Sequence, residues 1–216
     1  GVGRVRRDGF VVGGDAVNSE QIEVLATGCA EVAAEIVALD HELKGNRGSH
    51  RYSFGGSSLT RSQLHRPAWQ MLLDVPVVHE LVSRIFGSQD YSLRSASGDF
   101  CLPGATQYQP LHSDTRDYKD AKSTPFSSFI DPAGNMSIRD LPSPYVCANF
   151  LPQDVTALNG PTRQIPGTQN SREPIPSLAQ EPEWMKLSTV CPAPAGAVMI
   201  RDVRAWHGGT PNVSDA

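Results

Sequence analysis

The sequence lacks any long apolar run, and its longest stretches without a polar residue fall far short of the roughly 18 residues that span a bilayer. It therefore predicts no membrane span. It also lacks an excess of positive charge, because 19 Lys and Arg face 23 Asp and Glu, for a formal net charge of -4. A general nucleic-acid binder needs a clustered basic surface to neutralise phosphates, so this composition argues against nucleic acid as a partner.

Closely spaced cysteines are also missing. The four cysteines are widely separated and form no CxxC pair: Cys29, Cys101, Cys147 and Cys191. Zinc ribbons and thioredoxin-type redox sites need such pairs, and both are therefore disfavoured. The chain begins at Gly1 rather than at an initiator Met, and shows neither an apolar signal region nor a small-residue cleavage site. We expect a cytoplasmic protein.

What the sequence does contain is enough for one folded domain over residues 1–216. Its 216 residues are 39% hydrophobic and 19% charged, which is too apolar for a disordered chain. Its 19 Gly and 17 Pro predict a globule rich in turns.

Helical patterns are concentrated in residues 18–87, after a short strand predicted over 7–12. Asn18 is a good N-cap, with Gln21 three residues later, and apolar residues keep helical spacing to about residue 44. Residues 45–60, rich in Gly, Ser and Arg, predict a loop.

A second helical region follows that loop. Pro67 suits the start of a helix, and residues 75–86 carry a helical pattern that Gly87 stops.

After Gly87 the pattern changes to short apolar segments broken by Gly, Pro, Asn and Asp, which is typical of an all-β core over residues 88–216. The predicted strands are 91–94, 100–102, 106–112, 145–151, 163–165, 187–191 and 197–200. The helices of 18–87 would brace this core, as a barrel or sandwich. Residues 115–144 are polar and longer than an ordinary connection, and predict a lid-like insertion.

The first candidate for chemistry is His112-Ser113-Asp114. Residues i and i+2 of a strand point to one face, so an imidazole and a carboxylate would converge on one ion. The tripeptide alone is a weak signal, because taken by itself it fits a surface histidine beside a turn aspartate better than a metal site.

His207 is the second candidate, after the 197–200 strand and before Gly208-Gly209, which predicts a turn that leaves space beside the ring. A lone histidine next to Trp206 is more often a packed side chain. Two histidines and one carboxylate together, however, occupy one face of an octahedron and leave positions for an oxidant and a chelating co-substrate, as in non-haem Fe(II) oxygenases. Tetrahedral zinc could use the same ligands, although no obvious general-base glutamate accompanies them.

The order of these motifs resembles the phytanoyl-CoA dioxygenase family of Fe(II)- and 2-oxoglutarate-dependent oxygenases. The likeness covers most of the chain, and its motifs are DGFVV at 8–12, QPLHSD at 109–114, NGPTRQIPGT at 159–168, PAGAV at 194–198, WHGG at 206–209 and PN at 211–212. Within NGPTRQIPGT, the Asn-Gly turn at 159–160 and the Pro-Gly-Thr corner at 166–168 are similar to an equivalent pair in that family. They make the match more specific than the HxD tripeptide alone.

The resemblance implies a mainly β fold with flanking helices and a double-stranded β-helix, or jelly-roll, core. It implies His112, Asp114 and His207 as catalytic iron ligands. It also implies that 2-oxoglutarate lies beside Gln109 and Asn149, and that Arg204 occupies a position where the family often places a small co-substrate contact. Gln109 and Asn149 could equally have structural roles only.

The same resemblance implies the reaction: iron and 2-oxoglutarate activate dioxygen, succinate and carbon dioxide are released, and a small organic substrate is oxidised. Halogenating relatives replace the carboxylate ligand with a small residue, whereas Asp114 is present here. We therefore expect hydroxylation, desaturation or oxidative ring chemistry, on a substrate of specialised metabolism.

The family anchors the distal carboxylate of 2-oxoglutarate with an arginine about ten residues after the second histidine, where a guanidinium can bind a carboxylate through two hydrogen bonds. The sequence ends at Ala216, before that position, so we expect the anchor and a closing strand beyond it. Arg201 and Arg204 are the possible substitutes, and strand parity gives Arg201, not Arg204, the inward direction of His207.

Two other classes of function stay open at this point. The absence of a visible anchor arginine leaves room for a non-catalytic metal-binding jelly-roll module, and the ligand types leave room for a zinc hydrolase.

Overall fold

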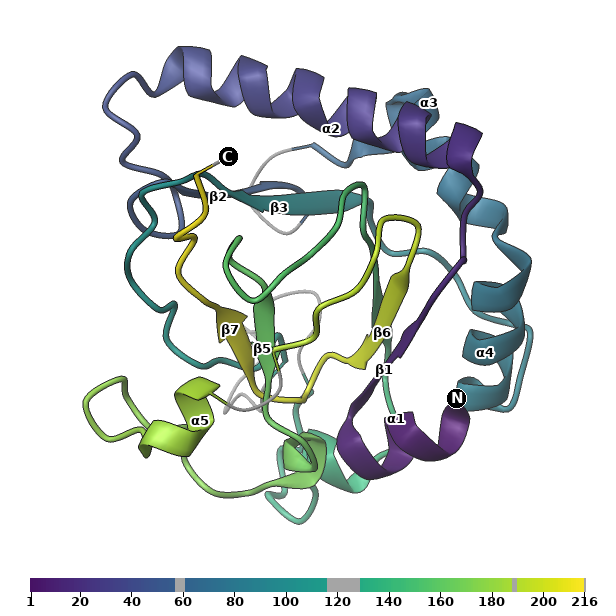
Figure 1. Cartoon of the computed structure of the whole chain (residues 1–216). Helices are drawn as coiled ribbons and strands as arrows, with labels where there is room; N and C mark the ends of the chain where they lie inside the picture. Colours follow the sequence, from purple (N-terminus) through teal and green to yellow (C-terminus); the bar gives the residue numbers. More distant parts are fainter. Residues whose placement is uncertain (57–60, 116–128, 188–189, 216) are drawn as a thin grey trace.

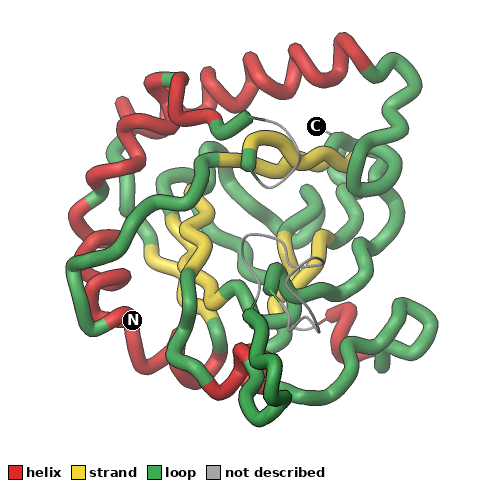
Figure 2. The backbone as a smooth tube through the Cα atoms, turned by 180° about the vertical axis from the view of Figure 1, so that it is seen from behind, coloured by secondary structure: helices red, strands yellow, loops and turns green. Residues whose placement is uncertain are grey.

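Short strands in three small antiparallel sheets form the centre of the molecule, with helices on the outside (Figures 1 and 2). This architecture comes from a computed structural model, which describes residues 1–56, 61–115, 129–187 and 190–215. The helices of the first half of the chain lie along the outer sides, and the later residues supply most of the strands (Figure 1).

The chain begins with helix α1 (Val2–Asp8), followed by strand β1 (Phe10–Gly13). The strand predicted over 7–12 is therefore wrong in its first residues, which end the helix. Gly9 makes the transition, because its φ of 87° is a left-handed conformation that glycine adopts without a Cβ clash.

Helix α2 (Ser19–Leu39) begins where the sequence predicts. The Asn18 side chain accepts a hydrogen bond from the Gln21 N–H, and the Gln21 side chain accepts one from the Asn18 N–H, each at 2.9 Å. This reciprocal pair is a capping box. The helix ends at Leu39, earlier than the predicted residue 44, and the Asp40 carboxylate then accepts a hydrogen bond from the Gly45 N–H.

The loop predicted over 45–60 is wrong in part, because it contains strand β2 (Arg51–Gly55). β2 pairs with β3 (Ser97–Cys101), and buried Tyr52 stacks on Phe100 with ring centroids 4.7 Å apart. The composition of the segment resembles that of a loop, but a partner strand more than forty residues away supplies the hydrogen bonds.

The second helical region matches its prediction. After a 3-10 turn, η1 (Gln63–His65), helix α3 (Pro67–Gln70) has its proline in the first turn. Another turn, η2 (Met71–Asp74), leads into α4 (Pro76–Phe86), which Gly87 ends with a φ of 68°. Proline suits a helix start because its missing N–H has no partner there.

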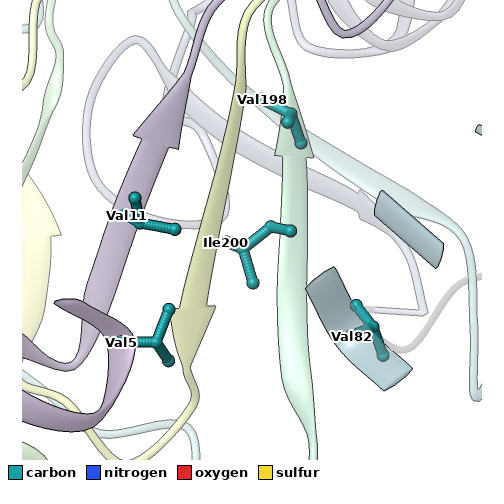
Figure 3. Packing of buried hydrophobic residues seen from close by; sticks show 5 residues of the cluster. All are labelled: Val5, Val11, Val82, Val198 and Ile200. Atoms are coloured by element: carbon teal, nitrogen blue, oxygen red, sulfur yellow. The ribbon is translucent and has the colours of Figure 1, made fainter. Parts of the chain in front are cut away.

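The largest sheet has the order β1-β6-β4, with β6 (Val198–Asp202) between β1 and β4 (Val146–Phe150). Val198 and Ile200 of β6 point outward into a buried apolar cluster, which is completed by Val5, Val11 and Val82 (Figure 3). Since side chains alternate along a strand, Met199 and Arg201 point to the opposite, inner face.

The inner face of this sheet is opposite a two-stranded sheet formed by β5 (Thr162–Gln164) and β7 (His207–Gly209). The two layers are in contact, because Gln164 Nε2 lies 3.5 Å from Met199 Sδ. β7 thus places His207 close to the inner side of β6.

Three predicted strands differ from the structure. Residues 91–94 form no strand, and Tyr91 instead makes a hydrogen bond with His79 of α4 at 2.7 Å. In 106–112, His112 alone forms a β-bridge, with His207. In 187–191, Leu187 ends helix α5 (Glu183–Leu187), residues 188–189 lie outside the described residues, and Val190 forms a bridge with Arg163.

The predicted insertion at 115–144 is described only outside 116–128. Its later part contains a 3-10 turn, η4 (Ile138–Asp140), which contacts another, η5 (Thr168–Asn170). No helix among the described residues is long and apolar enough to cross a membrane.

Candidate metal centre

His112, Asp114 and His207 meet at one point, where His207 is buried and the side chains of His112 and Asp114 are 40% and 36% exposed. Asp114 Oδ1 lies 3.8 Å from His112 Nε2 and 3.5 Å from His207 Nε2. One potential ligand atom from each residue lies within 4.8 Å of the other two. A histidine 93 positions beyond Asp114 (207 minus 114) thus joins the HxD tripeptide, as the sequence predicts.

Backbone hydrogen bonds hold the three side chains on the same side. His112 and His207 exchange two N–H···O bonds of 3.0 Å each, which pairs their backbones directly. The Asp114 N–H donates to the Val203 carbonyl at 2.9 Å, just after β6. The tripeptide is therefore attached to both β7 and the end of β6.

The same backbone decides which imidazole nitrogen is free. His112 Nδ1 lies 3.1 Å from the Pro110 carbonyl oxygen, and His207 Nδ1 lies 3.0 Å from that of Ala205. A carbonyl oxygen can only accept, so each Nδ1 carries the proton and donates it. Each Nε2 is left with a lone pair directed toward Asp114, as in most metal-bound histidines.

Electrostatics favour the metal-binding forms of these groups. Burial raises the pKa of Asp114, but contact with His207 and the positive charge of Arg201 outweigh it and hold this pKa well below its usual range. Burial, helped by the charge of Arg201, lowers the pKa of His207 to about 4. At neutral pH the carboxylate is ionised and the imidazole is neutral, which metal binding requires.

The donor set fits iron. Two imidazole nitrogens and one carboxylate oxygen are the donors of the non-haem Fe(II) facial triad, which leaves further coordination positions to other ligands. Within the described ranges, no other group of three or more His, Cys, Asp or Glu side chains is placed to hold a metal ion.

Gly208 and Gly209 are not the turn that the sequence predicts, because both belong to β7. A Cβ on Gly208 would lie 2.9 Å from the Gln109 carbonyl oxygen, and one on Gly209 would overlap the Arg51 guanidinium. Glycine is needed here so that other segments can pack against the strand that carries His207.

Replacing Gly208 with alanine is therefore expected to displace β7 and to weaken Fe(II) binding at least severalfold. The backbone oxygen of Gln109 cannot move aside as a flexible side chain would. Gly13→Ala is the matched control, because a Cβ at this other strand glycine meets nothing within 4 Å. Metal titrations of both variants test the prediction, and equal affinities would contradict it.

The two polar residues expected beside the co-substrate lie at different sheets, Gln109 against β7 and Asn149 on β4. Gln109 Oε1 accepts a hydrogen bond of 3.0 Å from the Gly209 N–H. Asn149 is the register partner of Met199 on β4, and its neighbours Ala148 and Phe150 pack outward into the apolar cluster. Alternation along the strand therefore directs Asn149 to the inner face.

Arg204 is not directed to the co-substrate position that the sequence suggested. Its guanidinium donates to both Asp202 carboxylate oxygens, at 3.0 and 2.7 Å, and to the carbonyls of Ile138 and Leu141, at 2.9 and 2.8 Å. Every guanidinium nitrogen thus has an acceptor within the protein. The side chain lines a cavity of about 280 Å³ together with Asp202 and Gln169.

Two charged residues near the proposed metal ligands were not among the site residues that the sequence predicted. Arg201, considered only as a substitute anchor, donates from Nη2 to Asp114 Oδ2 at 3.0 Å. Asp99 of β3 interacts electrostatically with both Arg201 and Asp114, and desolvation raises its pKa. Strand parity signals the inward direction of Arg201, whereas Asp99 lies before the predicted 100–102 strand and carries no sequence signal.

Comparison with known families decides the identity. The family model described as phytanoyl-CoA dioxygenase (PhyH) matches residues 5–216. The chain belongs to the phytanoyl-CoA dioxygenase family. It is therefore a non-haem iron oxygenase that uses Fe(II), 2-oxoglutarate and dioxygen, as this family does. Membership decides against the two alternatives left open by the sequence, a non-catalytic metal-binding module and a zinc hydrolase.

Solved structures similar to this family member confirm the fold. AviO1 from Streptomyces viridochromogenes Tue57 is 18% identical, with a TM-score of 0.58 over 100% of this chain and 88% of its own. The non-haem α-ketoglutarate-dependent carbocyclase SnoK from nogalamycin biosynthesis is 17% identical, with a TM-score of 0.62 over 100% and 78%. EctD from S. alaskensis, solved with 2-oxoglutarate and 5-hydroxyectoine, is 16% identical, with a TM-score of 0.59 over 99% and 70%. The mainly β, jelly-roll prediction is confirmed.

Proposed function

We propose that His112, Asp114 and His207 bind the Fe(II) of this oxygenase and that the enzyme oxidises a small organic substrate of specialised metabolism. The observation that carries the ligand assignment is the convergence of the Nε2 atoms of His112 and His207 on Asp114 Oδ1, at 3.8 and 3.5 Å. Both Nδ1 atoms are already used by backbone carbonyls, so the metal is the remaining partner for each ring.

The residues of the chain set the conditions for the reaction. Bound iron and 2-oxoglutarate together supply the oxidising power, drawn from dioxygen. Asp114 offers a negative charge that partly neutralises the metal, and the imidazoles of His112 and His207 fix its position. Three protein ligands on one face leave the remaining coordination positions to co-substrate and oxidant. The backbone bonds from His112 to His207 and from Asp114 to Val203 hold the ligands in place.

The presence of Asp114 favours hydroxylation, desaturation or oxidative ring chemistry over halogenation. A halide ligand needs the coordination position that the carboxylate takes here. The two solved neighbours described as a carbocyclase and an epimerase, SnoK and SnoN of the nogalamycin system, support ring chemistry on an organic metabolite as one outcome for a jelly roll of this shape.

Gln109 and Asn149 are proposed to border the 2-oxoglutarate. The Gly209 N–H holds the oxygen of the Gln109 amide, so its NH₂ group is the part that can donate to a carboxylate. Asn149 lies on β4 and offers another amide. Arg204 has no part in this proposal, since each of its three guanidinium nitrogens already donates to an acceptor within the protein.

An anaerobic titration with Fe(II) and then 2-oxoglutarate tests the ligand assignment. The iron chelate of 2-oxoglutarate has a visible metal-to-ligand charge-transfer band, which we expect in the wild-type protein. His112→Ala and His207→Ala should lose the band, because each removes one of three protein ligands. His65→Ala is the control, as this histidine is exposed and its Nδ1 contacts the backbone carbonyl of Ser62, a residue of its own turn. Variants at His112 and His207 that keep the full band would overturn the assignment.

A further inference from the structure

Arg201 is a buried cation on the central strand of the largest sheet. It lies on β6, between Phe10 of β1 and Cys147 of β4 in the register, and only 5% of its surface is exposed. Neighbouring Ile200 packs into the outer apolar cluster, so Arg201 points inward. Strands on both sides hold its backbone in place.

The hydrogen bonding of Arg201 is unusually sparse. Nη2 donates to Asp114 Oδ2 at 3.0 Å. Within the described residues neither Nε nor Nη1 has an oxygen or nitrogen acceptor, although both are buried. The thiol of Cys147, which faces Arg201 across the register, is a weak acceptor only.

An arrangement of this kind is weak evidence for a stabilising role. Desolvating a guanidinium is costly, and replacing a buried ion pair with apolar side chains often leaves stability unchanged or raised. The role of Arg201 is therefore sought in its hydrogen bond to Asp114. Because of that bond, the two oxygens of the Asp114 carboxylate have different partners. Oδ1 faces the Nε2 atoms of His112 and His207, and Oδ2 is held by Arg201.

We propose that Arg201 is a positioning residue that keeps Asp114 a ligand through one oxygen, and thereby keeps a coordination position open for 2-oxoglutarate. A carboxylate that binds through both oxygens must turn Oδ2 toward the metal and would occupy a fourth position. The hydrogen bond from Arg201 opposes that rotation, and hydrogen bonds between charged groups are the stronger ones. This inference rests on the proposed ligand set of His112, Asp114 and His207.

The proposal predicts opposite effects on the metal and on the co-substrate when Arg201 is replaced by methionine. Asp114 gains freedom to bind through both oxygens, and a positive charge near the divalent ion is removed. Metal affinity should therefore stay the same or rise. Chelation by 2-oxoglutarate should become roughly 10- to 100-fold weaker, corresponding to the loss of one hydrogen bond to a charged group. A residue with a merely structural role would weaken both.

Arg201→Met and Arg201→Lys are compared with the wild-type protein in two titrations: Mn(II) alone, and 2-oxoglutarate added to the Mn(II)-loaded protein. Lysine keeps the charge and a donor, so we expect it to restore 2-oxoglutarate affinity to within about threefold of wild type. Crystal structures of the Mn(II)-loaded proteins should show one Asp114 oxygen near 2 Å from the metal in wild type and two in Arg201→Met. Thermal unfolding verifies that each variant is folded.

Three results would overturn the inference: Mn(II) and 2-oxoglutarate affinities that fall together in Arg201→Met, affinities that are both unchanged, or an Asp114 that still binds through one oxygen in that variant. The ligand proposal is judged separately. If Asp114→Ala and His207→Ala bind Mn(II) as wild type does, the ligand set itself is wrong. If they lose Mn(II) while Arg201→Met behaves like wild type, the ligand set stands and the role of Arg201 does not.

Discussion

Replacing Asp114 with alanine or glycine is expected to abolish turnover and to weaken iron binding more than roughly 100-fold. Changing an outer partner of a metal ligand already costs roughly 10- to 100-fold, and Asp114 is proposed to bind the metal directly. The change removes the one negative charge of the set and leaves Arg201 buried without its carboxylate partner. Succinate release and the iron that remains after gel filtration are the measurements.

One further variant separates charge from shape at this position, and a second variant elsewhere serves as the control. Asp114→Asn keeps an oxygen that can accept from Arg201 but loses the charge, and we expect it to lose most of the iron too. Asp74→Ala is the control, since its carboxylate is 96% exposed. Unchanged product formation in Asp114→Ala would show that this carboxylate is not a necessary ligand.

The second large effect concerns stability, at the buried ion pair of Arg163 and Glu181. Both side chains are 0% exposed, and they are joined by two hydrogen bonds of 2.6 and 3.0 Å. Glu181→Gln should lower the free energy of unfolding by about 3–5 kcal/mol, because it leaves the Arg163 charge buried without a counter-ion. Denaturant unfolding measures this loss.

The control is Glu183→Gln, which changes an exposed glutamate paired with Lys186 on α5. Its effect should stay within about 0.5 kcal/mol, as for most surface substitutions. Iron affinity should also fall in Glu181→Gln, because Arg163 pairs with Gly208 in the register and donates to the Gln109 carbonyl beside β7. Equal stability of the two variants would contradict the prediction.

The sequence alone determined the features that depend on a few neighbouring residues. The Asn18 and Gln21 cap, the Pro67 helix start and the Gly87 stop are local, because each involves hydrogen bonds or backbone angles within one turn. The two-residue spacing of His112 and Asp114 predicted that both side chains lie on one side, and in the structure they do converge, with His207. The order of motifs along the chain was enough to indicate the family, which the family model confirms.

Tertiary structure decided the features that depend on distant partners. β2 appears only because β3 supplies its hydrogen bonds, and Gly208-Gly209 forms a strand because Gln109 and Arg51 pack against it. Strand pairing of this kind is set by contacts across the chain, which local composition does not encode.

The two arginines considered as anchors for 2-oxoglutarate also show which features the sequence determined and which the tertiary structure decided. Strand parity placed Arg201 on the inner face, but its bond to Asp114 joins residues 87 positions apart. Arg204, only three residues further on, instead donates hydrogen bonds to the Asp202 carboxylate and to the carbonyls of Ile138 and Leu141. A long guanidinium binds whichever acceptors the folded chain brings within reach, so its partners are decided only when the distant segments meet.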